Sequence, residues 1–181
     1  AKKLECPVCL QSCIHPARLP CGHVFCFLCV KGIAQYGSRR CAMCRRPIPS
    51  DYLDNPVLVE TPESPLLPDQ EDTYQWYYEG RNGWWQYDVR ASTELEAAYL
   101  RGDLTCELLI AGYLYTVDFE EMVQARRSEP ARRRRIKRDT ADCPKKGVAG
   151  LRQSQPVNQS SSTVAEVTVA MAKLNIDTTR L

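Results

Sequence analysis

Hydrophobic and polar positions are distributed unevenly along the chain, and their pattern predicts two folded modules. Residues 74–119 carry eleven of the fifteen aromatic residues, and short apolar runs alternate there with turn residues. Alternation with a period of two predicts β-strands that bury one face. Residues 1–48 lack this pattern and hold eight of the ten cysteines instead. We therefore expect a cysteine module followed by an aromatic, β-rich module.

The aromatic module is expected to begin with a hairpin over residues 73–90. Asn82-Gly83 is a strong signal for a two-residue turn, because both central residues of such a turn need a positive φ. Strand geometry then divides the hairpin side chains between two faces. One face is predicted to carry Trp76, Tyr78, Trp85, Tyr87 and Val89, and the other Arg81, Trp84 and Gln86.

A helix and a second hairpin are expected next. Thr93 and Glu96 have the spacing of a capping box, which predicts a helix from there to about Arg101. A second hairpin is expected to join strands 105–110 and 113–118 through Ala111-Gly112. Cys106, Leu108 and Ile110 alternate inward there, which makes Cys106 a small core residue.

A third, basic strand pair is expected over residues 122–127 and 132–138. Arg134 has the same parity as the apolar Ile136, so its side chain should point toward the interior or the mouth of the curled sheet. A guanidinium buried without an acidic partner is costly. This position therefore favours an anionic ligand.

The net charge of +2 hides a strongly polarised chain. Residues 49–73 hold seven acids, five prolines and no Lys or Arg, which predicts an extended linker. Residues 126–138 hold eight bases and one acid. From Gly147 the composition predicts a disordered tail, although 164–169 has some strand character. The expected organisation is a cysteine module at 1–48, a linker at 49–73, a second module at 74–146 and a tail at 147–181.

Composition also excludes several classes of protein. The longest mostly apolar run, residues 108–117, is far shorter than the ~20 residues that cross a bilayer. The chain opens AKKLEC, without a secretory signal, and its first residue is not Met, which is compatible with a fragment. Clustered cysteines are typical of zinc domains in a reducing compartment rather than of disulfide scaffolds.

The cysteine module has the spacing of two zinc sites. Its ligands read Cys6-x2-Cys9, x11, Cys21-x-His23-x2-Cys26-x2-Cys29, x11, Cys41-x2-Cys44. Eight nitrogen and sulfur ligands fill two tetrahedral Zn²⁺ sites and leave no open position for a catalytic water. The spacing leaves both sequential and interleaved pairing open. Cys13 and His15 are interpreted as a loop thiol and a solvated or capping imidazole.

The order of three cysteines, one histidine and four cysteines resembles the RING family. The resemblance implies one zinc held by Cys6, Cys9, Cys26 and Cys29 and a second held by Cys21, His23, Cys41 and Cys44. It implies binding of a ubiquitin-conjugating enzyme (E2), through Val8 in the first knuckle and Ile33 after Cys29. It also implies that Arg45 clamps ubiquitin onto the E2. Ala42 stands where many members have proline.

The aromatic run resembles the WWE family. Trp76, Tyr77-Tyr78-Glu79-Gly80 and Trp84-Trp85 carry the resemblance. It implies a small α+β fold, a twisted β half-barrel with one helix, that binds iso-ADP-ribose, the repeating unit of poly(ADP-ribose). The implied ligand residues are Tyr78, Trp85 and Tyr115 around adenine and ribose, Gln124 at the base edge, and Arg81, Arg134 and Lys146 at the two phosphates.

The two modules together resemble poly(ADP-ribose)-dependent E3 ubiquitin ligases. This implies an E2, ubiquitin and poly(ADP-ribosyl)ated proteins as partners, a cytoplasmic and nuclear location, and a role for Lys31 in joining the RING to the ligand. Tankyrase is a partner of such ligases, but residues 127–132 have Arg where its docking motif needs Gly. A zinc-bearing nucleic-acid binder and a RING scaffold without ligase activity remain alternatives.

Overall fold

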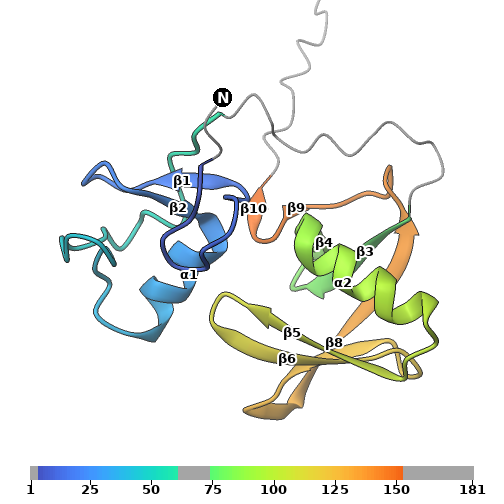
Figure 1. Ribbon diagram of the computed structural model, residues 1–181. Helices are drawn as coiled ribbons and strands as arrows, with labels where there is room; N and C mark the ends of the chain where they lie inside the picture. Colours follow the sequence, from blue (N-terminus) through green and yellow to red (C-terminus); the bar gives the residue numbers. More distant parts are fainter. Residues whose placement is uncertain (1–3, 61–73, 153–181) are drawn as a thin grey trace, which may run out of the picture.

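The computed structural model describes residues 4–60 and 74–152, which form two modules side by side (Figure 1). The first module contains strands β1 (Pro16–Arg18) and β2 (Val24–Cys26) and helix α1 (Phe27–Tyr36). The second is a curled eight-stranded sheet with one helix, α2 (Val89–Leu100). This architecture confirms the predicted fold class. No helix of the described residues is long and apolar enough to cross a membrane.

The first module has a small core built around one hairpin and one helix. β1 and β2 pair antiparallel with Ala17 opposite Phe25. Phe25, Phe27 and Val30 are at most 2% exposed, and the zinc-ligand candidates Cys6 and Cys41 belong to the same cluster. A core of this size cannot stabilise such a module without help. Metal ligation is the natural source of the missing folding free energy.

The segment that follows the first module corrects the predicted linker boundary. Residues 49–60 pack on the module instead of leaving it at residue 49. Tyr52 is buried and its hydroxyl donates to the Arg18 carbonyl at 2.8 Å. The backbone also pairs along β1, with Arg18 N donating to Val57 O and Val59 N to Pro16 O, both at 2.8 Å. The open edge of β1 explains this, because its unpaired backbone groups need partners. Residues 61–73 of the predicted linker lie outside the described residues.

The sheet of the second module has the strand order β10-β9-β4-β3-β8-β7-β6-β5. Its neighbouring strands are antiparallel except β4 and β9, which run parallel. The strands are β3 (Tyr74–Gly80), β4 (Gly83–Gln86), β5 (Thr105–Ile110), β6 (Tyr113–Asp118), β7 (Val123–Arg126), β8 (Glu129–Thr140), β9 (Gly147–Val148) and β10 (Leu151–Arg152).

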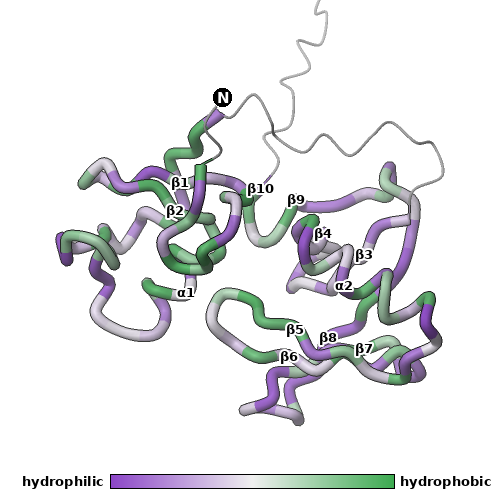
Figure 2. Tube along the Cα trace, in the orientation of Figure 1, coloured by the Kyte–Doolittle hydropathy of each residue, from purple (hydrophilic) through white to green (hydrophobic). Residues whose placement is uncertain are grey.

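The core of this module lies between α2 and the inner face of the sheet. Leu95 of α2 is fully buried with Trp76, Leu108 and Val117. Ile136 also belongs to this cluster, as its parity predicted. Figure 2 shows that the apolar end of β5 lies on the side of the sheet that faces α1. The second module therefore offers an apolar edge to the first.

The first hairpin turns one residue earlier than predicted. Gly80 pairs with Gly83, so the two turn residues are Arg81 and Asn82 rather than Asn82 and Gly83. Gly83, with a φ of +128°, opens β4. Each residue of β3 therefore pairs two positions away from its predicted partner. Because side chains alternate with a period of two, this shift leaves every side chain on its predicted face. Tyr78 therefore still lies opposite Trp85 on the predicted face.

Helix α2 begins one turn earlier than the capping box predicted. Asp88 is the N-cap, and its side chain accepts a hydrogen bond from Ala91 N at 2.8 Å. Asp is among the strongest N-cap residues and outcompetes Thr93. Glu96 does not reach back to the backbone but accepts from Trp76 Nε1 at 2.8 Å and pairs with Arg138.

The predicted tail is wrong for its first six residues. Residues 147–152 form the hairpin β9–β10, in which Ala149 N donates to Gln86 O at 2.8 Å. Leu151 packs against the core of the first module. The apolar Val148 and Leu151 gain burial that a disordered segment would forgo, which explains the ordering. Residues 153–181, including 164–169, lie outside the described residues.

Candidate zinc sites and ligand cavity

The structure gathers the eight zinc-ligand candidates in the two groups that the RING resemblance implies. One group is Cys6, Cys9, Cys26 and Cys29, and the other is Cys21, His23, Cys41 and Cys44. In each group, the candidate ligand atoms lie within 4.8 Å of one another. The pairs interleave along the chain, so the sequential alternative does not describe this fold.

The geometry of both groups fits tetrahedral zinc. Tetrahedral bonds of ~2.3 Å place two sulfur atoms ~3.8 Å apart, and the Cys9 and Cys26 Sγ atoms are 3.8 Å apart. His23 Nδ1 lies 3.5 Å from Cys21 Sγ and 3.6 Å from Cys41 Sγ, which identifies Nδ1 as the ligand atom. The donor set, sulfur with one imidazole, is the set that structural zinc prefers.

Backbone amides support the sulfur atoms from outside the sites. Ile14 N donates to Cys26 Sγ at 3.3 Å, Cys26 N to Cys6 Sγ at 3.4 Å and Met43 N to Cys41 Sγ at 3.4 Å. Such contacts stabilise thiolates and orient the ligands. Cys13 and His15 lie outside both groups. Burial raises the pKa of Cys13 to about 12 and lowers the pKa of His15, so both side chains are neutral near pH 7.

Two of the three predicted E2-contact residues share a groove. Val8 and Ile33 line a groove of about 520 Å³ whose opposite wall includes Leu109, Ile110 and Ala111 of the second module. Val8 is 43% exposed, so it is available to a partner. Arg45, with a φ of +60°, is exposed and is not part of this groove.

A second cavity, of about 180 Å³, lies between α1 and the curled sheet. It is lined by five of the residues that the resemblances singled out: Lys31, Tyr78, Tyr115, Gln124 and Arg134. Arg134 is exposed overall but lines the cavity, which places it at the mouth. The expected orientation of Arg134 therefore agrees with the structure.

Three predicted ligand residues do not line this cavity. Arg81 lies in the turn between β3 and β4 and is exposed. Lys146 Nζ lies 5.4 Å from the centre of the Trp85 ring, so these two side chains form a second cluster at the same end of the hairpin. We call Arg81, Trp85 and Lys146 the hairpin-end cluster. The predicted set is thus divided between two neighbouring places.

Sequence reasoning missed several residues that line the cavity. The predicted alternation puts Tyr87 on the face that lines the cavity, and Arg126 shares the parity of Gln124 on β7. Alternation with a period of two is therefore the signal that identifies both residues. Tyr113 likewise alternates with Tyr115. Gln35 comes from α1, and no sequence signal connects it to this cavity. The missed lining residues with polar side chains are Gln35, Tyr87, Asp88, Tyr113 and Arg126.

The cavity is electropositive. Lys31, Arg126 and Arg134 all line it, and burial together with the two guanidinium groups lowers the pKa of Lys31. The one acidic lining residue, Asp88, uses its carboxylate to cap α2. Converging cations with little local compensation attract an anion.

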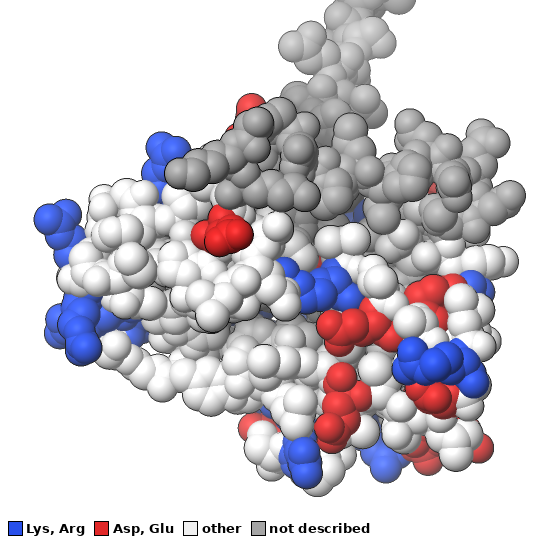
Figure 3. Space-filling model, viewed as in Figure 1, with Lys and Arg blue, Asp and Glu red and all other residues white. Residues whose placement is uncertain are grey.

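The arginines next to Arg134 are paired on the outside of the sheet. Arg135 donates to Glu79 at 2.6 and 3.0 Å, and Arg133 forms an ion pair with Glu121. Figure 3 shows blue and red side chains next to one another on this module. Within the described residues, Arg134 forms no such ion pair. The basic run at residues 132–135 is therefore a mixed surface with one arginine, Arg134, directed to the cavity.

Tyrosine side chains supply the rest of the cavity wall. The rings of Tyr78 and Tyr87 meet edge to face, with centroids 4.9 Å apart. Burial raises the pKa of Tyr78 to about 12, so its hydroxyl stays neutral. The Arg126 guanidinium lies 3.8 Å from the centre of the Tyr113 ring and donates to the Tyr115 hydroxyl at 3.1 Å. This wall offers flat faces for a base or sugar beside cations for phosphate.

Comparison with known proteins agrees with both modules. The family model of the C3HC4-type zinc finger (RING finger) matches residues 2–50, and the model of the WWE domain matches residues 74–138. The chain is therefore a RING–WWE protein.

The chain is a relative of RNF146. It is 56% identical over 165 residues to the E3 ubiquitin-protein ligase rnf146 of Danio rerio, covering 88% of this chain and 45% of that protein. It is 59% identical over 148 residues to the ligases named RNF146 of Xenopus tropicalis and Homo sapiens. These alignments cover 82% of this chain and 46% and 41% of those proteins. The chain thus spans less than half the length of the relatives it matches.

Proposed function

We propose that this chain acts as a RING-type E3 ubiquitin transferase that depends on poly(ADP-ribose). In this proposal the WWE module binds iso-ADP-ribose units, and the ligand-bound protein activates an E2 through the RING module. Poly(ADP-ribosyl)ated proteins are then ubiquitinated and degraded, in the cytoplasm and the nucleus. The observation that carries the proposal is the cationic, tyrosine-lined cavity where the two modules meet.

The RING module supports a mechanism in which acyl transfer takes place on the E2. Its eight ligand positions account for eight of the cysteine and histidine side chains. Of the other described thiols, Cys13 and Cys106 have a pKa raised by burial, and Cys143 is buried. A nucleophilic cysteine needs an accessible thiol with a depressed pKa. The chain would therefore supply binding and orientation rather than a catalytic cysteine.

The cavity supports recognition of a nucleoside with an attached phosphate. Its volume of about 180 Å³ is below the ~300–1,000 Å³ of pockets that enclose a drug-sized ligand. It would hold the base and one ribose, framed by Tyr78 and Tyr115. The remainder of iso-ADP-ribose would extend along the protein surface, with the hairpin-end cluster as a second contact. Stacking on aromatic rings contributes ~1–3 kcal/mol per base.

The position of Lys31 supports communication between ligand and RING. Lys31 belongs to α1, and a Cβ added at Gly150 of the second module would lie 2.9 Å from its Nζ atom. A Cβ added at Gly32 would lie 3.1 Å from the Ala111 backbone, so the two modules pack closely around this point. A phosphate that contacts Lys31 from α1 and Arg134 from β8 would favour this packed arrangement. A switch of this kind requires different affinities for two states.

The decisive experiment is discharge of ubiquitin from a charged E2, with and without iso-ADP-ribose. We expect faster discharge with the ligand, and loss of this stimulation in the Trp85→Ala and Arg134→Ala variants with basal discharge retained. Arg135→Ala is the matched control, because its guanidinium pairs with Glu79 outside the cavity. Equal rates with and without ligand would reject the switch, and substrate recruitment alone would remain.

A calorimetric titration separates this proposal from nucleic-acid binding. We expect saturable binding of iso-ADP-ribose that exceeds binding of an RNA oligomer of the same charge. Equal affinities with a steep salt dependence would instead indicate nonspecific attraction by the basic run. The ion pairs of Arg133 and Arg135 argue for the specific ligand, because they consume much of the charge that a polyanion would need.

A further inference from the structure

Tyr87 and Gln124 form a buried pair at the wall of the cavity. Tyr87 is 2% exposed and Gln124 is 3% exposed, yet both line the cavity. The Tyr87 hydroxyl donates to Gln124 Oε1 at 2.5 Å. Tyr87 lies directly after β4 and Gln124 lies on β7, so the contact joins two strands that are not neighbours in the sheet.

This contact determines which end of the amide is free. A side-chain amide has a carbonyl oxygen that accepts and an NH₂ group that donates. Burial raises the pKa of Tyr87 well above its usual value, so the hydroxyl keeps its proton and remains a donor. A donor can be satisfied only by the oxygen of Gln124. The nitrogen, Nε2, is therefore the atom left for another partner.

The free nitrogen is open to the cavity. Within the described residues, Gln124 Nε2 donates no hydrogen bond. Ser92 Oγ is the one fully buried side-chain polar atom that lacks a partner there, so the unpaired Nε2 is not fully buried. Nε2 is therefore not sealed inside the protein, and the accessible space beside Gln124 is the cavity. A bound molecule that covers this donor without pairing it would pay a desolvation cost, so a ligand gains by presenting an acceptor there.

We propose that Tyr87 is a positioning residue that fixes the hydrogen-bond polarity of the ligand site by holding Gln124 with its amide nitrogen toward the cavity. This inference rests on the proposed function and specifies what the site selects. The base that enters must present an acceptor, such as an unprotonated ring nitrogen of adenine, to Gln124 Nε2. Tyr87 would contact the base only through its ring, because its hydroxyl is bound to Gln124.

The test is a double-mutant cycle on the affinity of the whole chain for iso-ADP-ribose, measured by calorimetry. Tyr87→Phe keeps the ring and its contact with Tyr78 but releases the amide, so we expect about 3- to 10-fold weaker binding. Gln124→Ala should weaken binding at least as much. In the Gln124→Ala background, the further change Tyr87→Phe should alter the affinity less than twofold, because its effect passes through the missing amide.

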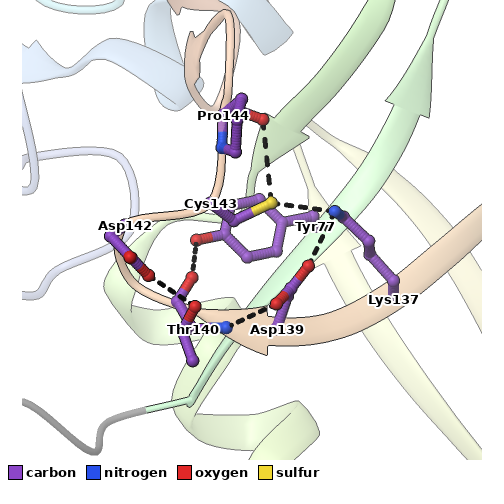
Figure 4. Close-up of polar contacts among 7 residues, drawn as sticks. All are labelled: Tyr77, Lys137, Asp139, Thr140, Asp142, Cys143 and Pro144. Atoms are coloured by element: carbon purple, nitrogen blue, oxygen red, sulfur yellow. Dashed lines mark hydrogen bonds and ion pairs between the residues drawn. The ribbon is translucent and has the colours of Figure 1, made fainter.

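Tyr77→Phe is a matched control for the loss of a buried hydroxyl. Tyr77 is fully buried, and its hydroxyl donates to the Thr140 carbonyl at 2.7 Å (Figure 4), on the opposite face of β3 from the cavity. We expect this variant to lose thermal stability as Tyr87→Phe does but to keep its affinity within twofold. The comparison separates positioning of the ligand site from general loosening of the fold.

The possible failures are distinguishable. Additive effects of the two substitutions, or an equal loss of affinity in Tyr77→Phe, would overturn the positioning role while leaving ligand binding intact. Absence of saturable binding to the unmodified chain would overturn the proposed function itself. Coupled substitutions with an unaffected Tyr77→Phe would support Tyr87 as the residue that sets the polarity of the site.

Discussion

Replacing Arg126 with alanine tests whether the cavity is an anion site. Arg126 was not singled out by sequence, yet its side chain lines the cavity and is only 28% exposed. Its guanidinium carbon, Cζ, lies 3.8 Å from the centre of the Tyr113 ring, and its Nε donates to the Tyr115 hydroxyl. These two contacts hold the guanidinium in place before a ligand arrives, so little side-chain entropy remains to be lost on binding.

The expected loss of affinity follows from one hydrogen-bonded charge. A hydrogen bond to a charged group contributes ~1.5–3 kcal/mol, which corresponds to about 10- to 150-fold in affinity. Glu129 Oε1 lies 3.8 Å from Arg126 Nη1, so this carboxylate competes with an incoming anion. The lower end of the affinity range therefore applies. We therefore expect the dissociation constant of Arg126→Ala for iso-ADP-ribose to rise about tenfold.

Calorimetric titration at physiological salt measures this change, with Arg135→Ala as the control. Arg135 is exposed and pairs with Glu79 away from the cavity, so its removal should change the affinity less than twofold. Equal losses in the two variants would mean that only the overall positive field attracts the ligand. An unchanged affinity in Arg126→Ala would refute the assignment of the cavity as an anion site.

Two further predictions concern stability. Chelation of zinc should unfold the RING module and release two metal ions per chain, while tryptophan emission stays native, because all three tryptophans lie in the WWE module. A shift of that emission at the same chelator concentration would show that the WWE module cannot stand alone. Hydrogen bonds from Arg138 and Trp76 lower the pKa of Glu96. The ionised Glu96 carboxylate therefore stabilises the fold above the ordinary pKa of a glutamate, and this stabilisation is lost as the pH falls through the lowered pKa. Between pH 6 and pH 3, the unmodified chain should therefore lose more free energy of unfolding than the Glu96→Gln variant. Parallel curves of unfolding free energy against pH would contradict this.

Some parts of the fold could be predicted because the signal and its cause lie within a few residues. The turn at Ala111-Gly112 is such a case. The two residues have φ values of +49° and +80°, as a two-residue hairpin turn requires, and the strands on both sides alternate correctly. The eight zinc ligands are similar, since a two-residue gap brings two thiols to one metal. Their interleaved pairing needed the family resemblance.

The hairpin β9–β10 shows how a local signal can be overlooked. Its turn is Ala149-Gly150, with φ values of +52° and +91°, so it has the same dipeptide and nearly the same geometry as the turn between β5 and β6. The polar composition of the following residues concealed it. Composition averages over many residues, whereas a turn of this type is decided by two.

The cavity could not be predicted as a whole because its walls come from both modules. Gln35 and Lys31 lie on α1, Ala149 follows β9, and the tyrosines come from the sheet. No periodicity relates α1 to residues that follow it by more than forty positions. The residue types alone indicate the chemistry of the individual side chains. Their proximity depends on the packing of the two modules, where Gly32 closely approaches the Ala111 backbone.

The position of the cavity has a thermodynamic consequence. If a ligand occupies it, the ligand contacts groups from α1 and from the sheet at the same time, so its affinity depends on whether the modules are packed together. Linkage makes this relation reciprocal, so the ligand must stabilise the packed state by the same free energy. Ile33, two residues after Lys31 on α1, is a predicted E2 contact and lines the same groove as Val8, a second one. Ligand-stabilised packing would therefore fix the helix that carries Ile33, a predicted E2 contact. Stimulation of discharge, rather than ligand binding alone, is therefore the measurement that distinguishes a switch from recruitment.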